Sequence, residues 1–336
     1  MIPLAGASRR FVATICTVGF LSAPPLCAQS LHATTVIAYD DKGQSGGGIF
    51  TRANLLGAPD GNVCTLGVGG FVTLGFAVTI VDGPGADFLV AENPFFSGPV
   101  GNAFSEAAFV EVSSNGVDFA RFPAGYYGAQ VYPGPFGTVP VAAYSNLAGI
   151  CPVVFGPTID VRDVVAAGAD AFDLADLRSD PLVIAGKVKL TQIKQVRIVD
   201  VVSGIDLDGR GTKIFDPSTG SADIDGVTVI HHSGDTAPSR PTVALTIPTD
   251  GNLTLTISHP AGLSALDPAT FGISLYGTPL ANPFDLLGAL TLTAVTATGF
   301  TVRLGGTLPP GFLLRMSVSI ADQQGHISGA TSIRPG

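Results

Sequence analysis

Residues 109–122, FVEVSSNGVDFARF, are the stretch from which the fold can be predicted. Polar and apolar residues alternate from Phe109 to Ser113, which is the two-residue period of a half-buried strand. Asn115 and Gly116 then supply the positive φ angles that a tight hairpin turn requires. The residues after the turn return as a second strand, so the stretch predicts an antiparallel β-hairpin.

Similar strand patterns lie on both sides of this hairpin. They occur at residues 34–40 (TTVIAYD), 71–76 (FVTLGF), 87–91 (DFLVA), 196–202 (VRIVDVV) and 227–231 (VTVIH). Hydrophobic residues make up 46% of the chain and charged residues only 13%, and there are 43 glycines and 25 prolines. This composition is typical of a turn-rich β protein and not of a helical bundle, so we expect an all-β fold.

The length of 336 residues is sufficient for two domains. We expect a first, β-rich domain at residues 30–232, a linker at 233–241 (SGDTAPSRP) and a second domain at 242–336. In the second domain, runs such as LTLTIS (253–258) and GFTVRL (299–304) recur with turns between them. That rhythm is typical of a small β-sandwich.

Residues 1–28 have the features of an export signal. Arg9 and Arg10 form a basic start, residues 11–23 form an apolar run, and LCA at 26–28 fits a cleavage site. The apolar run is too short to span a bilayer, and no later segment is predicted to do so. We therefore expect a secreted or cell-surface protein whose mature chain has no membrane span.

The cysteines predict a disulfide in that setting. Cys16 and Cys27 lie in the export signal, which leaves Cys64 and Cys151 in the mature chain. In an oxidising compartment a remaining pair is expected to be bridged. The alternative is two separate buried thiols.

Several phrases of the first domain resemble a family of secreted bacterial cell-surface proteins. They are LGAPDG (56–61), VGGFVTLGF (68–76), IVDGPGADFLVAEN (80–93), FSEAAFVEVSSNGVDFARFP (104–123), AFDLADL (171–177), VRIVDVV (196–202) and ADIDGVTVI (222–230). The hairpin and the VRIVDVV strand are also similar to galactose-binding-like jelly rolls of the discoidin kind. The resemblance implies a jelly-roll β-sandwich, a surface location, and calcium or glycan binding. The second domain resembles bacterial immunoglobulin-like modules, which implies a smaller immunoglobulin-like β-sandwich.

An acidic loop, residues 204–225, is a candidate calcium site. Calcium takes six to eight oxygen ligands, often from a loop that can fold around the ion. Five aspartates stand between glycines in this loop: Asp206, Asp208, Asp216, Asp223 and Asp225. The alternative is a solvated loop held by Asx turns. A second acidic set that could join the site in space consists of Asp87, Glu92, Asn93 and Glu106.

A tyrosine loop, residues 123–157, is a candidate ligand site. It is rich in glycine, proline and tyrosine, and long loops of this kind are often functional. Sugars stack their apolar face on aromatic rings beside hydrogen-bonding groups, which Tyr126, Tyr127 and Tyr132 could offer. Arg121 could be a polar partner. The alternative is a loop that packs its own rings, and the absence of tryptophan from the chain favours it.

The net charge and the lack of catalytic motifs limit the classes of function that the sequence supports. The net charge of −9 disfavours nucleic acid as a partner. No pair of carboxylates is marked for glycoside hydrolysis, so no catalytic residue is predicted. We therefore expect a non-enzymatic binding or adhesion protein with a structural calcium and a glycan or cell-envelope partner. The alternatives are a carbohydrate-active enzyme, hydrolase or lyase, with paired carboxylates, and a purely structural envelope component.

Overall fold

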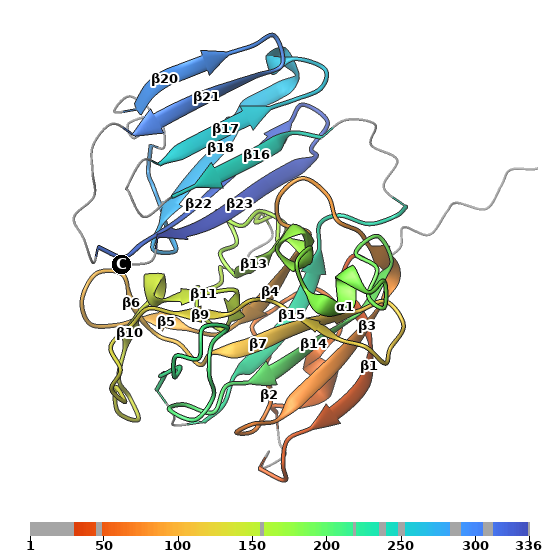
Figure 1. The fold of residues 1–336 in the computed structure, drawn as a ribbon, viewed down its shortest axis with the longest axis vertical. Helices are drawn as coiled ribbons and strands as arrows, with labels where there is room; N and C mark the ends of the chain where they lie inside the picture. The colour runs from red at the N-terminus through yellow and green to blue at the C-terminus, as the bar shows by residue number, and fades with distance from the viewer. Residues whose placement is uncertain are drawn as a thin grey trace, which may run out of the picture.

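The fold is all-β, as predicted. In the computed structural model almost every regular element of the described residues is a strand in an antiparallel sheet (Figure 1). The structure describes residues 30–44, 49–154, 158–217, 220–234, 240–247, 253–282, 290–304 and 312–334. The predicted export signal at 1–28 and the middle of the predicted linker, 235–239, lie outside these ranges.

Two sheets form the sandwich of residues 30–232. Sheet I has the order β1-β3-β14-β7-β12, with β8 paired to β7: β1 Ala33–Asp40, β3 Phe71–Ile80, β7 Ala108–Ser113, β8 Ala120–Arg121, β12 Leu147–Ala148 and β14 Ile193–Asp200. Sheet II has the order β13-β4-β15-β2: β2 Cys64–Thr65, β4 Phe88–Glu92, β13 Asp170–Phe172 and β15 Asp223–Val229.

The inner faces of sheets I and II share one core. Val72 and Ile198 of sheet I and Phe88 and Val227 of sheet II are fully buried in a single apolar cluster. Burying a side chain of this size contributes about 1.5–3 kcal/mol. The predicted alternation therefore places one set of side chains between the sheets.

Short strands complete this part of the chain. Three of them form the order β10-β6-β5 and two more pair as β11-β9: β5 Phe95–Phe96, β6 Asn102–Phe104, β9 Gly125–Tyr126, β10 Val139–Pro140 and β11 Tyr144–Ser145. The helical elements between strands are short: η1 Arg52–Leu55, η2 Val141–Ala143, η3 Leu174–Leu177 and α1 Pro181–Ile184. No helix in the described ranges is long and apolar enough to cross a bilayer.

Two further sheets form the second sandwich. Sheet III has the order β16-β17-β21-β20: β16 Thr242–Thr246, β17 Thr254–Ser258, β20 Leu290–Val295 and β21 Gly299–Leu304. Sheet IV has the order β19-β18-β22-β23: β18 Leu266–Leu275, β19 Thr278–Pro279, β22 Leu314–Asp322 and β23 Ile327–Arg334. The helical turn η4 (Leu263–Ala265) precedes β18, and Leu255, Ile273 and Val318 lie in the shared core of these sheets.

Sheet IV packs against the first sandwich (Figure 1). The Arg315 guanidinium of β22 lies 2.7 Å from the carboxylate of Asp170 in β13, and both side chains are buried. The N–H of Ala86 donates to the carbonyl oxygen of Gly329 in β23. Gly85, with φ +80°, permits this approach, because a Cβ there would lie 2.4 Å from the Gly329 oxygen.

The predicted hairpin pairing is confirmed. Strands β7 and β8 pair in antiparallel fashion, with Glu111 opposite Arg121 and Val112 opposite Ala120. The prediction of a tight turn with positive φ at both Asn115 and Gly116 is wrong: Gly116 has φ +77°, but Asn115 does not have a positive φ, and residues 114–119 form a longer loop. This loop is held by Asn115 Oδ1, which accepts the N–H groups of Val117 and Asp118. The returning strand is only two residues long, because the chain leaves the sheet soon after Arg121.

The predicted disulfide between Cys64 and Cys151 is wrong in this structure, where both cysteines are free and buried. Cys64 lies in β2 at one edge of sheet II. Cys151 donates its N–H to Asp170 in β13, at the other edge of the same sheet. Three strand spacings of about 4.8 Å separate those edges, whereas a disulfide needs Cα atoms about 4.4–6.8 Å apart. The alternative of two separate thiols is therefore the observed one.

Candidate functional site

The tyrosine loop and the acidic loop lie against each other. The N–H of Tyr126 donates to Asp208 Oδ2 at 2.9 Å, and the N–H of Gly209 donates to the carbonyl oxygen of Ala124 at 2.9 Å. Arg210 Nη2 donates to the carbonyl oxygen of Tyr126 at 2.6 Å. Segments that are about eighty residues apart in the sequence therefore form one surface.

Asp208 fixes the conformation of this junction. Its Oδ1 accepts the N–H groups of Arg210 (2.9 Å) and Thr212 (2.8 Å), which is an Asx-type turn. Burial alone would raise the pKa of Asp208, but the N–H groups of Tyr126, Thr212 and Arg210 and the Arg210 guanidinium lower the pKa to about 2. The carboxylate is therefore ionised at neutral pH and orients Arg210.

Arg210 in turn lies over an aromatic ring. Its guanidinium carbon is 4.0 Å from the centroid of the Tyr127 ring, a cation–π contact. Both residues line a cavity of about 380 Å³: Tyr126, Tyr127, Gly128, Gln130, Arg210, Thr212 and Leu313. Leu313 belongs to the second sandwich, so the cavity lies where the two loops meet that part of the chain.

Several polar atoms around this cavity have no protein partner. Within the described ranges, no hydrogen bond is made by the Tyr127 hydroxyl, Arg210 Nη1 or Gln130 Oε1. Gln130 is anchored through its Nε2, which donates to the carbonyl oxygen of Lys213. The cavity therefore presents a phenol, a guanidinium nitrogen and an amide oxygen that can bind a polar ligand.

The four residues predicted from the sequence to bind a ligand have different surroundings. Tyr126 is buried, and its hydroxyl donates to the carbonyl oxygen of Ala129, while burial raises its pKa to about 12. Tyr127 lines the cavity, and Tyr132 is exposed outside the lining. Arg121 pairs with Glu111 at 2.7 Å in sheet I. Of the four, Tyr127 is thus the residue placed to stack on a ligand.

Sequence reasoning missed Arg210 and Gln130. The sequence Asp208-Gly209-Arg210 is typical of an Asx turn, in which the side chain of Arg210 can contact the carboxylate of Asp208. Nothing in the sequence indicated that the turn would lie beside Tyr127, because that contact joins two loops remote from each other.

The structure does not gather the five aspartates of the predicted calcium site. No three of them have carboxylate oxygens within 4.8 Å of one another. The four besides Asp208 bind separate groups: Asp206 accepts the N–H of Val202, Asp216 that of Ala107, Asp223 the hydroxyl of Thr65, and Asp225 the N–H groups of Asp60 and Gly61. Asp223 and Asp225 also belong to β15, which begins inside the predicted loop.

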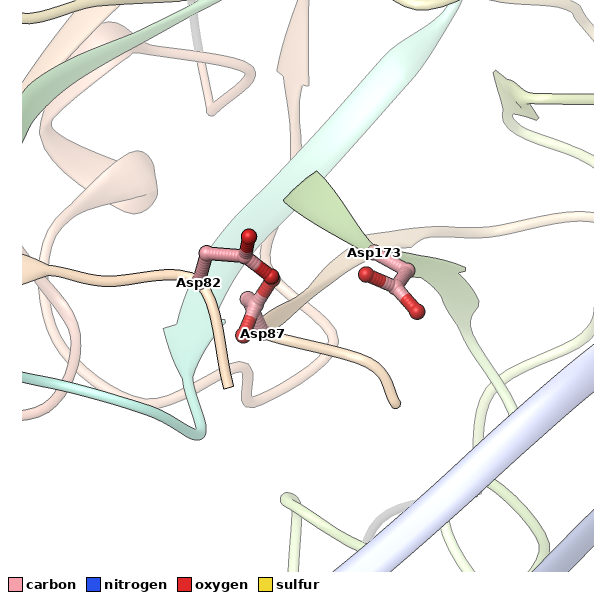
Figure 2. Close-up of side chains that lie close together, drawn as sticks. All are labelled: Asp82, Asp87 and Asp173. Carbon is pink, nitrogen blue, oxygen red and sulfur yellow. The ribbon is translucent and has the colours of Figure 1, made fainter. Parts of the chain in front are cut away.

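Another trio does have its carboxylates close together. In the described residues, Asp82, Asp87 and Asp173 have ligand oxygens within 4.8 Å of one another (Figure 2). Arg178 pairs with Asp82 at 2.8 Å, and Asp87 accepts the N–H groups of Gly83 and Leu174.

Two further contacts hold this trio. His231 Nδ1 lies 2.8 Å from Asp87 Oδ1, and Asp173 accepts the N–H of Ala175 at the start of η3. Arg178 supplies a positive charge and N–H groups bind both oxygens of Asp87, so the trio ties the turn before β4 to η3 and to the end of β15. Asp82 Oδ1, however, is buried and has no hydrogen-bond partner among the described residues.

Part of the second acidic set predicted from the sequence does assemble. Asn93 and Glu106 line a cavity of about 370 Å³ together with Asp223, and Phe95 and Phe104 contribute to its wall. Glu92 lies beside this group, since its Oε1 accepts the N–H of Asp223 at 3.0 Å. The fourth member, Asp87, belongs to the trio described above.

Comparison with known proteins adds no relative: no family model matches the chain, and no curated protein matches it.

Proposed function

We propose that this chain is an exported, non-enzymatic carbohydrate-binding protein of the cell surface. In this proposal residues 30–232 are a jelly roll of the discoidin kind and residues 242–336 an immunoglobulin-like sandwich. The observation that carries the binding function is the cavity where Tyr127, Arg210 and Gln130 meet.

The chemistry of this cavity suits an oligosaccharide. Sugar hydroxyls both donate and accept hydrogen bonds, and sugar rings have apolar faces. Arg210 Nη1 can donate, Gln130 Oε1 can accept, and the Tyr127 hydroxyl can do either. The partly exposed Tyr127 ring supplies the apolar surface beside them.

The cavity is also pre-organised. Arg210 is held by three hydrogen bonds, two to Asp208 Oδ2 and one to the carbonyl oxygen of Tyr126. A side chain fixed before binding loses little conformational entropy when the ligand arrives, so weak polar contacts suffice for a useful affinity.

Substitution of Tyr127 tests this proposal. The native protein is applied to a glycan array, and the Kd of each hit is measured by calorimetry for Tyr127→Ala. We expect a loss of affinity of about tenfold or more, because stacking and a hydroxyl contact are removed together. The matched control is Tyr132→Ala, on the same loop outside the cavity, which should bind as the native protein does. An array without hits, or an equal loss in both variants, would contradict the proposal.

One observation favours an enzyme as the second candidate. Glu106 lies beside Asp223 in the other cavity, and burial, followed by repulsion from Asp223, raises the pKa of Glu106 to about 8. A carboxylic acid that stays protonated near neutral pH is what glycoside hydrolysis requires of its acid. New reducing ends or unsaturated ends released from polysaccharides would favour this candidate. Blank arrays without such products would favour a purely structural envelope component.

A further inference from the structure

At the cavity beside β4 and β15, the described residues include two buried carboxylates and one half-buried carboxylate without a positive partner. Glu106 and Asp223 line it, and Glu92 lies next to them. Within the described ranges, no lysine, arginine or histidine lies within 4.0 Å of any of the three carboxylates. Three acidic groups therefore share a poorly solvated place without a cation.

Of the three carboxylates, that of Glu92 is the most deeply buried, and one of its oxygens lacks a hydrogen-bond partner among the described residues. It is 2% exposed, and its Oε1 accepts the N–H of Asp223. Its Oε2 is buried and has no hydrogen-bond partner. A buried carboxylate oxygen without a partner costs free energy, so natural proteins normally supply a donor or a metal ion.

The neighbours of Glu92 make its burial less favourable still. Burial raises the pKa of Glu92 well above its usual value, and the charges of Glu106 and Asp223 raise it further. Glu106 is 7% exposed, and repulsion from Asp223, Asp216 and Asp200 adds to the effect of its own burial. A cation placed between these groups would attract each of the three carboxylates.

We propose that this cavity binds one calcium ion through Glu92, Glu106 and Asp223, with Asn93 at its mouth. The site differs from the acidic loop predicted from the sequence, with which it shares only Asp223. The proposal does not depend on glycan binding, which concerns another cavity.

Calcium is the cation that these groups fit best. All of the polar side chains around the cavity offer oxygen, and Thr65, Asn93 and Ser221 add neutral oxygens to the three carboxylates. Calcium accepts six to eight oxygens in irregular geometry, whereas Mg²⁺ demands a near-ideal octahedron. The three carboxylates are not within 4.8 Å of one another in this structure, and glutamate rotamers can bring them closer when a cation binds.

The test uses the metal alone with the native protein. Calorimetric titration with CaCl2 is expected to give one site per chain. The melting midpoint is expected to rise by several degrees from EGTA to millimolar calcium, and to rise less with magnesium, because a ligand that binds only the folded state stabilises it.

Two charge-removing variants locate the site. Glu106→Gln and Glu92→Gln are each expected to weaken calcium binding by about tenfold or more, since each removes a charged ligand. In EGTA near neutral pH, Glu106→Gln is expected to melt at a higher temperature than the native protein, because glutamine, unlike Glu106, need not take up a proton to be buried. A merely structural glutamate would not show these two opposite effects. Should Glu92→Gln fail to fold, Glu106→Gln at the cavity wall decides alone.

Asp206→Asn is the matched control in the acidic loop, since an asparagine oxygen can still accept the N–H of Val202. This variant should bind calcium as the native protein does. The proposal is overturned if the native protein shows neither heat nor a change of midpoint with calcium. It is also overturned if Asp206→Asn loses binding while both glutamine variants keep it.

Discussion

Two buried carboxylates on neighbouring strands of sheet II have opposite surroundings. Asp170 of β13 binds the Arg315 guanidinium through Oδ1 and the N–H groups of Ile150 and Cys151 through Oδ2. Glu92 of β4 accepts one N–H through Oε1 and nothing through Oε2. Strands β13 and β4 are directly paired, with β13 at the edge of the sheet and β4 inside it.

The difference shows how the fold uses its acidic residues. Asp170 joins the two sandwiches, since Arg315 reaches it from β22. Glu92 is as deeply buried but binds only the N–H of Asp223 on the neighbouring strand β15. A buried carboxylate with a complete set of hydrogen-bond partners stabilises the fold. A buried carboxylate that lacks a partner is a candidate for binding a ligand.

The largest effect is expected from removing the partner of Asp170. Arg315→Met leaves Asp170 buried without its charge partner, so we expect the free energy of unfolding to fall by about 3–5 kcal/mol. Urea denaturation followed by circular dichroism measures it. The control is Lys42→Met, which removes an exposed pair with Asp40 and should change the free energy of unfolding little. A loss for Arg315→Met as small as that of the control would show that Asp170 does not need its partner.

An intermediate effect is expected from pH in the absence of calcium. Burial raises the pKa of Glu106 from 4.5 to about 8 in the folded chain. The folded state therefore holds this proton more tightly than the unfolded state. The stability that the proton confers is complete below pH 4.5 and is lost as the pH rises through about 8. Burial also raises the pKa values of the neighbouring Asp200 and Asp216, both to about 7, with the same sign.

The melting midpoint in EGTA should accordingly be higher at about pH 6.5 than at about pH 8.5, with a smaller difference in Glu106→Gln. Below that window His231 acts in the opposite direction, because burial lowers its pKa to about 4 and unfolding then takes up a proton. Calcium should abolish the part of the difference that Glu106 contributes. An identical pH response in the native protein and in Glu106→Gln would contradict the assignment.

The smallest effect is expected in the aspartate trio. Arg178→Ala removes the ion pair with Asp82, but the arginine side chain is 67% exposed. An ion pair exposed to water contributes little to stability, and the backbone donors to Asp87 and Asp173 remain. The same urea assay measures the loss. A cost near that of Arg315→Met would mean that Arg178 and not the backbone holds the trio together.

The strands were predictable from the sequence because the period of two is a local property. Residues 34–40, 71–76 and 196–202 were found, since alternation and flanking turns lie within a few residues. The start of β15 at Asp223 was not predicted, because aspartates such as Asp223 and Asp225 are typical of loops. Their burial against Thr65 and residues 60–61 depends on a strand far away in the sequence.

The sequence was sufficient to predict which loops carry candidate sites, but not which residues come together in each site. The sequence placed Tyr127 and the acidic loop among the candidates, and the contact of Asp208 with Tyr126 joins the two loops. It grouped five aspartates by proximity in the chain, whereas each of them binds a different backbone or side-chain group. Glu92 meets Asp223 only because β4 pairs with β15, and Glu106 reaches the same cavity from the segment before β7.

The two free cysteines have a practical consequence. Burial raises the pKa of Cys64 to about 11 and that of Cys151 to about 12, so neither thiol reacts readily while it stays covered. Cys64 lies in the core between sheets I and II, and Cys151 beside the Asp170–Arg315 pair. Maleimide labelling of single-cysteine variants would therefore follow two events separately: the opening of the first sandwich at Cys64, and the separation of the second sandwich from it at Cys151. Since the fold contains no bond between Cys64 and Cys151, production in a reducing cytoplasm would not remove a stabilising disulfide.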